Sequence, residues 1–298
     1  MSIIEKALDK NRTRKPAPPE TQETPAEDAA EATPAPAAAQ APVRSREVQI
    51  DFGWLRKQGI VVPGEARSSV AEEFRMMKRP LLNNAFGRHS AMQVRRGRLI
   101  MVTSSLPREG KTFTTTNLAL SIAMEVDRTV LLVDADVARP AVPDTLGFQA
   151  DRGLMDVLTE PDLDIPDVLL RTNVEGLSVL PAGRPHGRST ELLASQAMMQ
   201  LLDDLYERYD DRVILFDSPP LLATSEPGVL AHHMGQVVMV VDADTTPASS
   251  VERAMEQLQS CDVVLSMLNR AAPAPGLGYG GGYYSGGRTY GEDAREPS

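Results

Sequence analysis

A single run, LIMVTSSLPREGKTFTTTNLALSIAME at residues 99–125, constrains the fold of this chain more than any other. An apolar strand pattern leads into a turn that holds Gly110, Lys111 and Thr112, and a helical pattern follows at once. A phosphate-binding loop needs this context, because free N–H groups at the helix start face the phosphates. Gly110 lets the backbone approach closely, Lys111 spans the phosphate charge, and the Thr112 hydroxyl suits a magnesium site. The run therefore predicts a site for ATP and Mg²⁺ built around Lys111 and Thr112.

One position of this loop departs from the usual spacing. A phosphate loop normally has glycine five residues before Gly110, where this chain has Ser105. An ordinary turn between a strand and a helix is the alternative interpretation. Acidic residues elsewhere in the chain favour the nucleotide site.

These acidic residues end two further strand patterns. VLLVDAD places Asp134 and Asp136 after one apolar run, and VILFDSPP places Asp217 after another. The carboxyl ends of strands in a doubly wound sheet share one edge with the phosphate loop, so we expect the acids to meet it there. One carboxylate can hold magnesium while another orients an attacking hydroxyl and accepts its proton. For each acid taken singly, a helix cap or a loop position is the alternative.

The chain alternates between strand and helix patterns. Short runs rich in Val, Ile and Leu predict strands at Leu99–Thr103, Val130–Val133, Leu177–Leu180, Val213–Phe216, Val237–Val241 and Val263–Leu268. Helices are expected over residues 114–125, 189–209 and 249–259, preceded by an amphipathic helix over residues 68–84 that Pro80 kinks or ends. These patterns predict an α/β fold of the P-loop NTPase type, with a doubly wound, mostly parallel sheet and helices on both faces.

Composition divides the chain into four segments. Residues 1–10, MSIIEKALDK, have Ile and Leu at helical spacing and predict a short amphipathic helix, with a frayed terminus as the alternative. Residues 11–47 are rich in Ala and Pro and residues 271–298 in Gly and Tyr, so neither segment buries enough apolar surface to offset the entropy of ordering. We expect a disordered linker over 11–47, a P-loop domain over 48–270 and a flexible tail over 271–298.

Charge and cysteine content exclude several classes of function. The formal net charge of −10 argues against nucleic-acid binding, which needs clustered Lys and Arg. The single cysteine, Cys261, excludes an internal disulfide and fits a reducing compartment. No apolar run approaches the roughly 20 residues that cross a bilayer. We therefore expect a cytoplasmic protein that reaches a membrane only through a partner.

Residues 68–270 resemble the bacterial tyrosine kinases of polysaccharide loci, a branch of the P-loop ATPases. The resemblance rests on SSLPREGKT, VLLVDADVARP and VILFDSPPLL as three Walker-type motifs, on GLMDVL and STELLAS between them, and on a tyrosine-rich tail. The start MSIIEKALDK and the second motif are most similar to the stand-alone tyrosine autokinases of exosortase-linked exopolysaccharide clusters. The resemblance implies ATP-dependent autophosphorylation on tyrosine and regulation of exopolysaccharide synthesis, chain length or export.

The resemblance also implies roles for individual residues of the nucleotide site. The catalytic set is Lys111, Asp134, Asp136 and Asp217, in which Asp136 assists the substrate tyrosine, and the metal set is Thr112, Asp134 and Asp217. Contacts to the nucleotide are expected from Ser105, Arg108, Glu109, Gly110, Lys111, Thr112, Phe113 and Asn269. Asn269 resembles the family's adenine-edge residue, because an amide both donates and accepts hydrogen bonds. A helix or loop cap is the alternative for Asn269.

A charged helix motif is a further part of the resemblance. Glu72, Arg75 and Lys78 match the family's oligomerisation motif, although Lys78 stands where arginine is usual and Arg79 lies beside it. A solvated helix face is the alternative. The chain also has Arg108 where the family commonly has glycine, and Ala138 where it has arginine. Arg139 is adjacent to Ala138 and is a candidate to replace that arginine.

The tail carries tyrosines in a glycine-rich setting, GYGGGYYSGGRTYGE. Its flexibility suits presentation of a phenol to the active site of a neighbouring subunit, so we expect the phospho-acceptors to be Tyr279, Tyr283, Tyr284 and Tyr290. We expect a homo-oligomeric ring in which one tail enters the next ATP site, and which loosens as negative phosphates accumulate. A plain interaction or adhesion segment is the alternative for the tail.

The implied partners follow from the same resemblance. They are a separate chain-length-type protein of the inner membrane and an opposing tyrosine phosphatase, and the chain is expected to be peripheral to that membrane. Two other functions remain open. A partitioning or positioning ATPase normally has lysine where this chain has Leu106, and a regulatory scaffold that binds ATP without transferring phosphate is consistent with Arg108 and Ala138.

Overall fold

The structure is a computed structural model that describes residues 46–65, 68–87 and 94–271. The helix predicted over residues 1–10, nearly all of the linker over 11–47 and nearly all of the tail over 271–298 lie outside the described residues. The predicted phospho-acceptors Tyr279, Tyr283, Tyr284 and Tyr290 are among those outside. The P-loop region and its acidic partners are all described.

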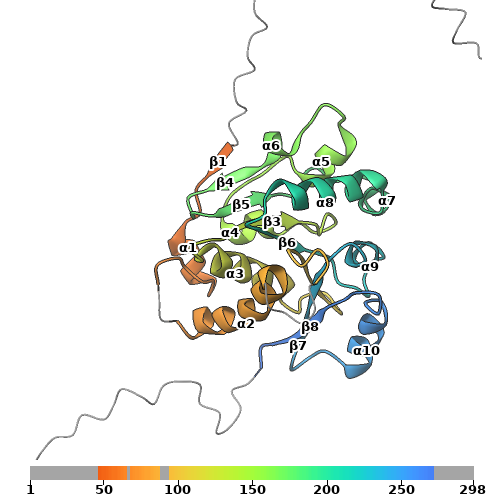
Figure 1. Cartoon of the computed structure of the whole chain (residues 1–298). Helices are drawn as coiled ribbons and strands as arrows, with labels where there is room; N and C mark the ends of the chain where they lie inside the picture. Colours follow the sequence, from red (N-terminus) through yellow and green to blue (C-terminus); the bar gives the residue numbers. More distant parts are fainter. Residues whose placement is uncertain (1–45, 66–67, 88–93, 272–298) are drawn as a thin grey trace, which may run out of the picture. The chain divides into compact units, whose positions relative to one another are not determined.

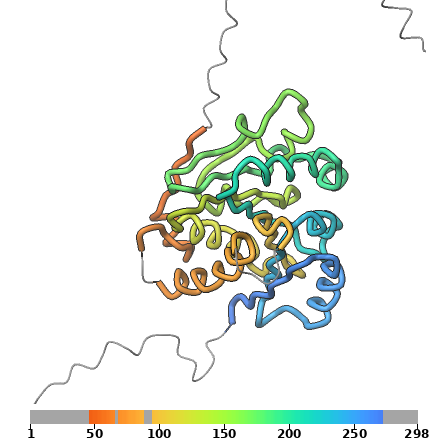
Figure 2. The backbone as a smooth tube through the Cα atoms, in the orientation of Figure 1, coloured from red at the N-terminus to blue at the C-terminus, as the bar shows by residue number. Residues whose placement is uncertain are grey.

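The described residues form one eight-stranded sheet (Figure 1). Its strands are β1 (Arg46–Val48), β2 (Leu99–Ser104), β3 (Thr129–Asp134), β4 (Leu170–Thr172), β5 (Leu177–Leu180), β6 (Arg212–Asp217), β7 (Gln236–Asp242) and β8 (Val264–Asn269). The spatial order is β1-β4-β5-β3-β6-β2-β7-β8, and every pair is parallel except β4 with β5. The described chain therefore begins at one edge strand and ends at the other (Figure 2).

Helices cover both faces of this sheet, because alternate residues of each strand point to opposite faces. In β2, Leu99 and Met101 enter one apolar core while Ile100 and Val102 enter the other. The second core is closed by α1 (Phe52–Lys57), α2 (Ser69–Phe86), α3 (Lys111–Ala123) and α4 (Val142–Leu146). The first core is closed by α5 (Leu154–Thr159), α6 (Ile165–Val168), α7 (Ser189–Leu193), α8 (Gln196–Arg208), α9 (Glu226–Ala231) and α10 (Ala248–Glu256). The predicted doubly wound, mostly parallel fold is confirmed.

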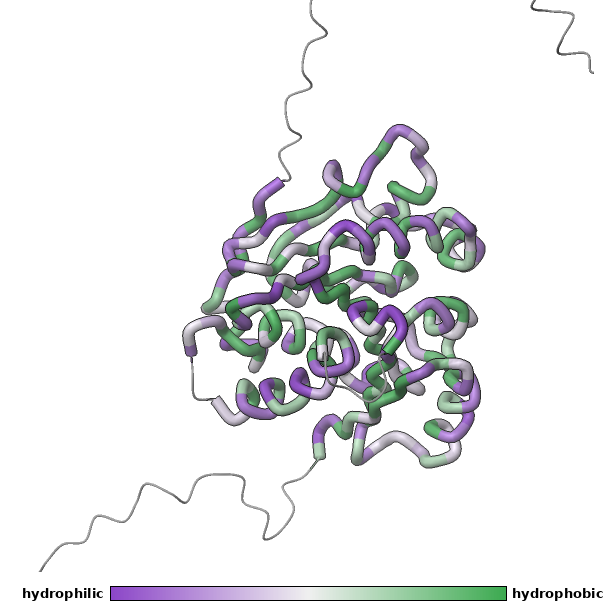
Figure 3. The backbone as a smooth tube through the Cα atoms, in the orientation of Figure 1, coloured by the Kyte–Doolittle hydropathy of each residue, from purple (hydrophilic) through white to green (hydrophobic). Residues whose placement is uncertain are grey.

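The central strands have continuous apolar runs with polar residues at their ends (Figure 3). Every residue of β2 and of β7 is buried. Strands with helices on both faces have no solvent side, so their sequences are continuous apolar runs. This is why the runs at Leu99–Thr103 and Val237–Val241 located these strands to within one residue at each end. None of the described helices is both long enough and apolar enough to span a bilayer.

Two helix predictions need correction. The helix expected over residues 189–209 is two helices, α7 and α8, because Ser195 breaks the run and accepts a hydrogen bond from Met198 N at 3.2 Å. The helix expected over 68–84 begins at its predicted Ser68 cap but continues past Pro80 to Phe86. Pro80 cannot donate to the carbonyl of Met76 one turn earlier, and Met76 is on an exposed face where water can satisfy that carbonyl.

Candidate active site

The phosphate loop and the predicted acids meet at the carboxyl edge of the sheet. Strand β6 lies between β2 and β3, and Asp217 at its end is in register with Val102 of β2 and with Asp134 of β3. The loop that follows β2 therefore starts beside both acidic strand ends. Three segments that are distant in the sequence converge on one edge, as the doubly wound topology requires.

The loop reaches α3 through a left-handed backbone at Gly110, whose φ is 93°. Thr114 N donates to Gly110 O at 2.9 Å, which makes Gly110 the N-cap of α3. A β-carbon at this position would collide with Nδ2 of Asn269. Glycine is thus required twice, by backbone conformation and by close packing. Arg108 also has a left-handed φ of 70°, which L-residues adopt at a cost.

Lys111 forms an ion pair with Asp136 at the start of α3. Its Nζ lies 2.7 Å from Oδ2 of Asp136, and both side chains are nearly buried. Burial disfavours the charged ammonium, but the carboxylates of Asp217 and Asp136 outweigh it, so the pKa of Lys111 lies above its ordinary value. The site thus holds a charged lysine among acids.

Asp217 is fully buried and receives two hydroxyl groups from α3. Thr112 Oγ1 donates to Oδ2 at 2.6 Å, and Thr115 Oγ1 donates to Oδ1 at 3.1 Å. Burial raises the pKa of Asp217, although Lys111 and the two hydroxyl groups oppose the shift. The sequence prediction did not include Thr115. Its spacing of three residues from Thr112, on the same helix face, is the signal that could have identified it.

Asp134 is the least satisfied carboxylate of the site. Its Oδ2 accepts from the N–H groups of Ala141 and Val142, each at 3.0 Å, at the start of α4. Its Oδ1 is buried and has no hydrogen-bond partner among the described residues. Burial first, and repulsion from Asp217 second, raise the pKa of Asp134 to about 7. A nearby cation would satisfy the free oxygen and restore the charged form.

These residues fit Mg²⁺ with a triphosphate. Magnesium prefers oxygen ligands and commonly takes one or two carboxylates together with phosphate oxygens and water. Asp134, Asp217 and Thr112 supply such oxygens beside the loop, and the unpartnered Oδ1 of Asp134 is the observation that best fits a cation there. No set of three or more His, Cys, Asp or Glu side chains in the described part of the chain is arranged as a protein-only metal cage.

The side chains of Ser105, Glu109 and Phe113 are directed into the protein, whereas that of Arg108 is exposed. The Glu109 carboxylate is buried, accepts from Leu106 N at 2.6 Å and accepts from the Thr246 hydroxyl. Phe113 packs edge-to-face on Phe74 of α2, with ring centroids 6.1 Å apart. Ser105 is also buried. A nucleotide contact by Glu109 or Phe113 would therefore use the backbone N–H.

Asn269 braces the loop from the end of β8. Its Nδ2 donates to Glu109 O at 2.9 Å, and its Oδ1 accepts from Arg270 N at 3.0 Å. Arg270 in turn binds Asp242 at the end of β7, with 2.6 Å between Nη1 and Oδ2. Sequence reasoning missed Asp242 and Thr246, although VVMVVDAD repeats the strand-then-acid pattern of VLLVDAD. The predicted adenine contact of Asn269 stays a prediction.

The predicted oligomerisation residues differ in exposure. Glu72 and Arg75 form an ion pair on the surface of α2. Lys78 is only 4% exposed, and its Nζ donates to Ser121 O at 2.5 Å and lies 2.6 Å from Oε1 of Glu125. Lys78 thus ties α2 to α3 within the chain. Arg79, beside it, is exposed.

The replacement suggested for Ala138 is close to the acidic set. Arg139 N donates to Oδ1 of Asp136 at 3.2 Å, which holds the turn after β3. The Arg139 side chain is exposed. The contact with Asp136 uses only the backbone of Arg139, whereas the family's arginine would contribute the charge of its side chain. The replacement of that charge by Arg139 therefore stays a prediction.

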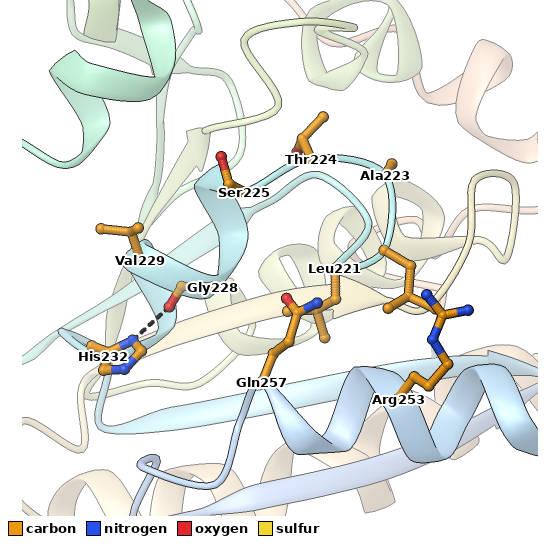
Figure 4. A pocket seen from close by; sticks show the side chains of 10 residues that line it. Leu221, Ala223, Thr224, Ser225, Gly228, Val229, His232, Arg253 and Gln257 are labelled. Atoms are coloured by element: carbon orange, nitrogen blue, oxygen red, sulfur yellow. Dashed lines mark hydrogen bonds between the residues drawn. The ribbon is translucent and has the colours of Figure 1, made fainter.

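A separate hollow of about 600 Å³ lies between α9 and α10 (Figure 4). The loop that lines it is joined to the end of β2 and the start of the phosphate loop, because Leu221 N donates to Ser104 O at 2.8 Å and Leu222 N donates to Ser105 O at 3.2 Å. Thr224 and Ser225 form one wall, and Arg253 and Gln257 of the α10 segment form the other. The hollow holds none of the predicted catalytic residues.

The chain is similar to several known proteins. EpsB of Ralstonia nicotianae is 36% identical over 174 residues, which cover 58% of this chain and 22% of EpsB. The tyrosine-protein kinase YwqD of Bacillus subtilis is 29% identical over 209 residues, which cover 70% of this chain and 84% of YwqD. The solved kinase domain of the Escherichia coli tyrosine kinase ETK matches 80% of this chain and 94% of that domain, with a TM-score of 0.57 and 25% identity.

Similarity is concentrated in the part of the chain that carries the site. This chain spans only 22% of the length of EpsB, and the match to YwqD is much more complete. Residues 98–262 match the AAA domain family, a range that includes the phosphate loop and the three acids. Because that range is more than half of the chain, the protein belongs to the AAA domain family, and within it resembles bacterial tyrosine-protein kinases.

Proposed function

We propose that this protein is an ATP-dependent protein-tyrosine autokinase that phosphorylates its own tail in trans. The observation that carries the proposal is the convergence of Lys111 with Asp134, Asp136 and Asp217 at one sheet edge. A cation for the phosphates, oxygen ligands for a metal and an acceptor for a proton are the groups that phosphoryl transfer requires. Similarity to YwqD and to the ETK kinase domain supports tyrosine as the acceptor.

The proposed roles follow the positions of the side chains. Thr112, Asp134 and Asp217 hold Mg²⁺, which when bound neutralises phosphate charge. Lys111 stabilises the charge that develops on the transferred group and on the leaving ADP. Asp136 orients the phenol and takes its proton as the oxygen–phosphorus bond to tyrosine forms and the bond to ADP breaks.

The Lys111–Asp136 ion pair couples nucleotide binding to the availability of Asp136 as a proton acceptor. Lys111 Nζ lies 2.7 Å from Oδ2 of Asp136, so the ammonium and the carboxylate are engaged with each other. A triphosphate competes for Lys111 and leaves Asp136 as a proton acceptor for tyrosine. We expect the acceptor function to be present mainly when ATP is bound, which disfavours unproductive proton transfer in the empty site.

The other parts of the proposal concern assembly and location. Residues 48–270 form the kinase domain, 11–47 the linker and 271–298 the acceptor tail. Subunits form a ring in which Glu72 and Arg75 contribute contacts, and each tail enters the next ATP site. An inner-membrane protein of the chain-length type recruits the ring from the cytoplasm, a phosphatase reverses the reaction, and the cycle regulates exopolysaccharide synthesis, chain length or export.

Phosphotyrosine mass spectrometry of the purified full chain with ATP and Mg²⁺ tests the reaction. We expect phosphate on Tyr279, Tyr283, Tyr284 and Tyr290, and none when all four are changed to Phe. Mixing a Lys111→Met chain with a four-Phe chain tests transfer in trans. The first chain then has the only acceptor tyrosines of the tail, and the second has the only intact ATP site. Release of inorganic phosphate without phosphotyrosine would instead indicate a partitioning-type ATPase, and ATP binding without either product would indicate a scaffold.

Oligomer size before and after ATP tests the ring. We expect ATP to reduce the size of the wild-type oligomer and to leave the four-Phe oligomer unchanged, because phosphates on the tail are the cause of loosening. Disassembly of the four-Phe oligomer by ATP would contradict this part of the proposal without affecting the kinase assignment.

A further inference from the structure

A basic groove of about 490 Å³ lies on the α2–α3 side of the sheet, away from the candidate active site. Arg75, Arg79, Leu82 and Phe86 of α2 line one side, and Glu125 and Arg128, beyond α3, line the other. Arg128 directly precedes β3, so this end of the groove is at the amino edge of the sheet. The ATP site is at the carboxyl edge, and the two are separate surfaces.

The charges of the groove are only partly compensated. Arg75 is paired with Glu72, and Glu125 is paired with Lys78. Arg79 and Arg128 form no ion pair with any described residue. A surplus of guanidinium groups on a chain with a net charge of −10 marks a local preference for anions.

The groove also has an aromatic and apolar wall. The guanidinium carbon of Arg128 lies over the Phe86 ring, 3.9 Å from its centroid, in a cation–π contact. Leu82 contributes apolar surface one turn earlier on α2. Arginine binds phosphate through two parallel hydrogen bonds, and an apolar wall suits an aryl ring. A phosphorylated phenol has both features in one side chain.

We propose that this groove binds a phosphotyrosine of the protein's own tail. Tyr283 is 12 residues beyond Ala271, the last described residue, and an extended chain of that length reaches up to about 40 Å. Helix α3 has 13 residues and so spans about 20 Å between the two sheet edges. The tail is therefore long enough to reach the groove from the end of β8, and its phosphates supply the charge that the groove lacks.

This inference rests on the proposed function for the source of the phosphate, and it adds a destination for the product. A tail docked at Arg79 and Arg128 is withdrawn from the ATP site at the opposite edge. It also covers Arg75, one of the residues predicted to join subunits. Docking thus links phosphorylation to weaker subunit contacts through competition for one surface.

Binding of a synthetic phosphopeptide tests the groove without any kinase activity. The probe is a fluorescent peptide of residues 276–292 with phosphate on Tyr283 and Tyr284, and the protein is the full chain after phosphatase treatment and removal of the phosphatase. We expect anisotropy to show at least tenfold tighter binding of this peptide than of its unphosphorylated form. The double change Arg79→Ala and Arg128→Ala should reduce that affinity at least tenfold.

Arg253→Ala is the matched control, because Arg253 is an exposed arginine in the other hollow (Figure 4). We expect it to change affinity less than twofold. Arg79→Ala alone covers the case in which loss of Arg128 from Phe86 impairs folding, and it should weaken binding at least threefold. Equal affinity for the two peptides, or equal losses in the Arg79 and Arg253 variants, would overturn the proposal.

The outcome is independent of the kinase test. If the groove binds phosphopeptide and the chain makes no phosphotyrosine, the groove assignment holds and another kinase must supply the phosphate. If the chain phosphorylates its tail and the groove does not bind the peptide, the kinase assignment holds and the docking proposal is wrong.

Discussion

Buried acids end the strands on both sides of the phosphate loop, and the two sides differ in how those acids are satisfied. On the β7 side, Asp242 accepts from Arg270 at 2.6 Å and from the N–H groups of Asp244 and Thr245. Burial opposes its ionisation, but these hydrogen bonds prevail and hold the pKa of Asp242 below its ordinary value. On the β3 side, Asp134 keeps an unpartnered oxygen and a pKa raised to about 7.

The difference distinguishes acids that stabilise the structure from acids that need a cation to balance their charge. A buried carboxylate with several donors is stable as an anion and fixes the backbone around it. A buried carboxylate without enough donors is destabilising unless something else supplies positive charge. The sheet edge thus has a braced side, formed by Asp242, Arg270, Asn269 and Glu109, and a reactive side, formed by Asp134, Asp136 and Asp217.

The largest expected effect is loss of the one lysine on the reactive side. Changing Lys111 to Met removes the cation that pairs with Asp136 and would stabilise the transferred phosphate. We expect tail phosphorylation to fall at least about 100-fold, measured by phosphotyrosine formed per minute. Lys57→Met is the matched control at an exposed end of α1, and its rate should equal that of the wild type. An unchanged rate in the Lys111 variant would refute the whole site.

The second prediction compares one acid from each side of the edge. Asp134→Asn keeps an oxygen for the N–H groups of Ala141 and Val142 and removes the buried charge. We expect the nucleotide-free variant to be more stable than the wild type by about 2–4 kcal/mol above pH 8. Asp242→Asn should lower stability, because it leaves Arg270 without its carboxylate.

The pH dependence follows from the sign of the shift. The pKa of Asp134 is about 7 in the folded chain and 3.8 without the fold, so the native state binds more protons between these values. Its contribution to stability therefore falls as pH rises from about 4 to 7. Denaturant unfolding should show the Asp134→Asn advantage near zero at pH 4 and complete above pH 8. A constant advantage across this range would show that burial of charge is not its cause.

The reactive side could largely be predicted from the sequence, whereas the braced side could not. Lys111, Asp134 and Asp217 directly follow apolar strands or open a helix, so local patterns locate them and parallel topology brings them together. The bond from Asn269 to Glu109 and the burial of Lys78 depend on contacts between distant segments, which no local pattern encodes. Strands β1 and β4 were missed because each has only three residues at the sheet margin.

The third prediction tests whether Asn269 of the braced side also forms hydrogen bonds with the nucleotide base. After its bonds to Glu109 and Arg270, the Asn269 amide retains one N–H and one lone pair. We expect Asn269→Ala to lower ATP affinity about tenfold and to reduce the preference for ATP over GTP, measured by calorimetry. Thr246→Val removes a different bond to Glu109, the one from the Thr246 hydroxyl to the carboxylate, and should leave the preference unchanged. Equal ATP-to-GTP ratios in the two variants would restrict Asn269 to bracing the loop.

The smallest expected effect is at Arg108, which is in the phosphate loop between the braced side and the reactive side. Arg108 has a left-handed backbone, which costs an L-residue about 1–2 kcal/mol and costs glycine almost nothing. Glycine offsets part of this gain because it raises the conformational entropy of the unfolded chain. Arg108→Gly should therefore stabilise the protein by only about 0.5 kcal/mol, or about 1–2 °C in Tm. The same change removes an exposed cation from the phosphate loop, so we expect ATP affinity to fall about threefold at low salt and less at high salt.

Two further variants separate backbone strain from charge at this position. Arg108→Asn removes the charge and tolerates the left-handed backbone, so it should behave like Arg108→Gly in both measurements. Arg108→Lys keeps the charge and the strain, so it should match the wild type. A Gly variant that is less stable than the wild type would mean that the arginine side chain itself stabilises the loop, and the strain at residue 108 would then be compensated by contacts rather than retained for the nucleotide.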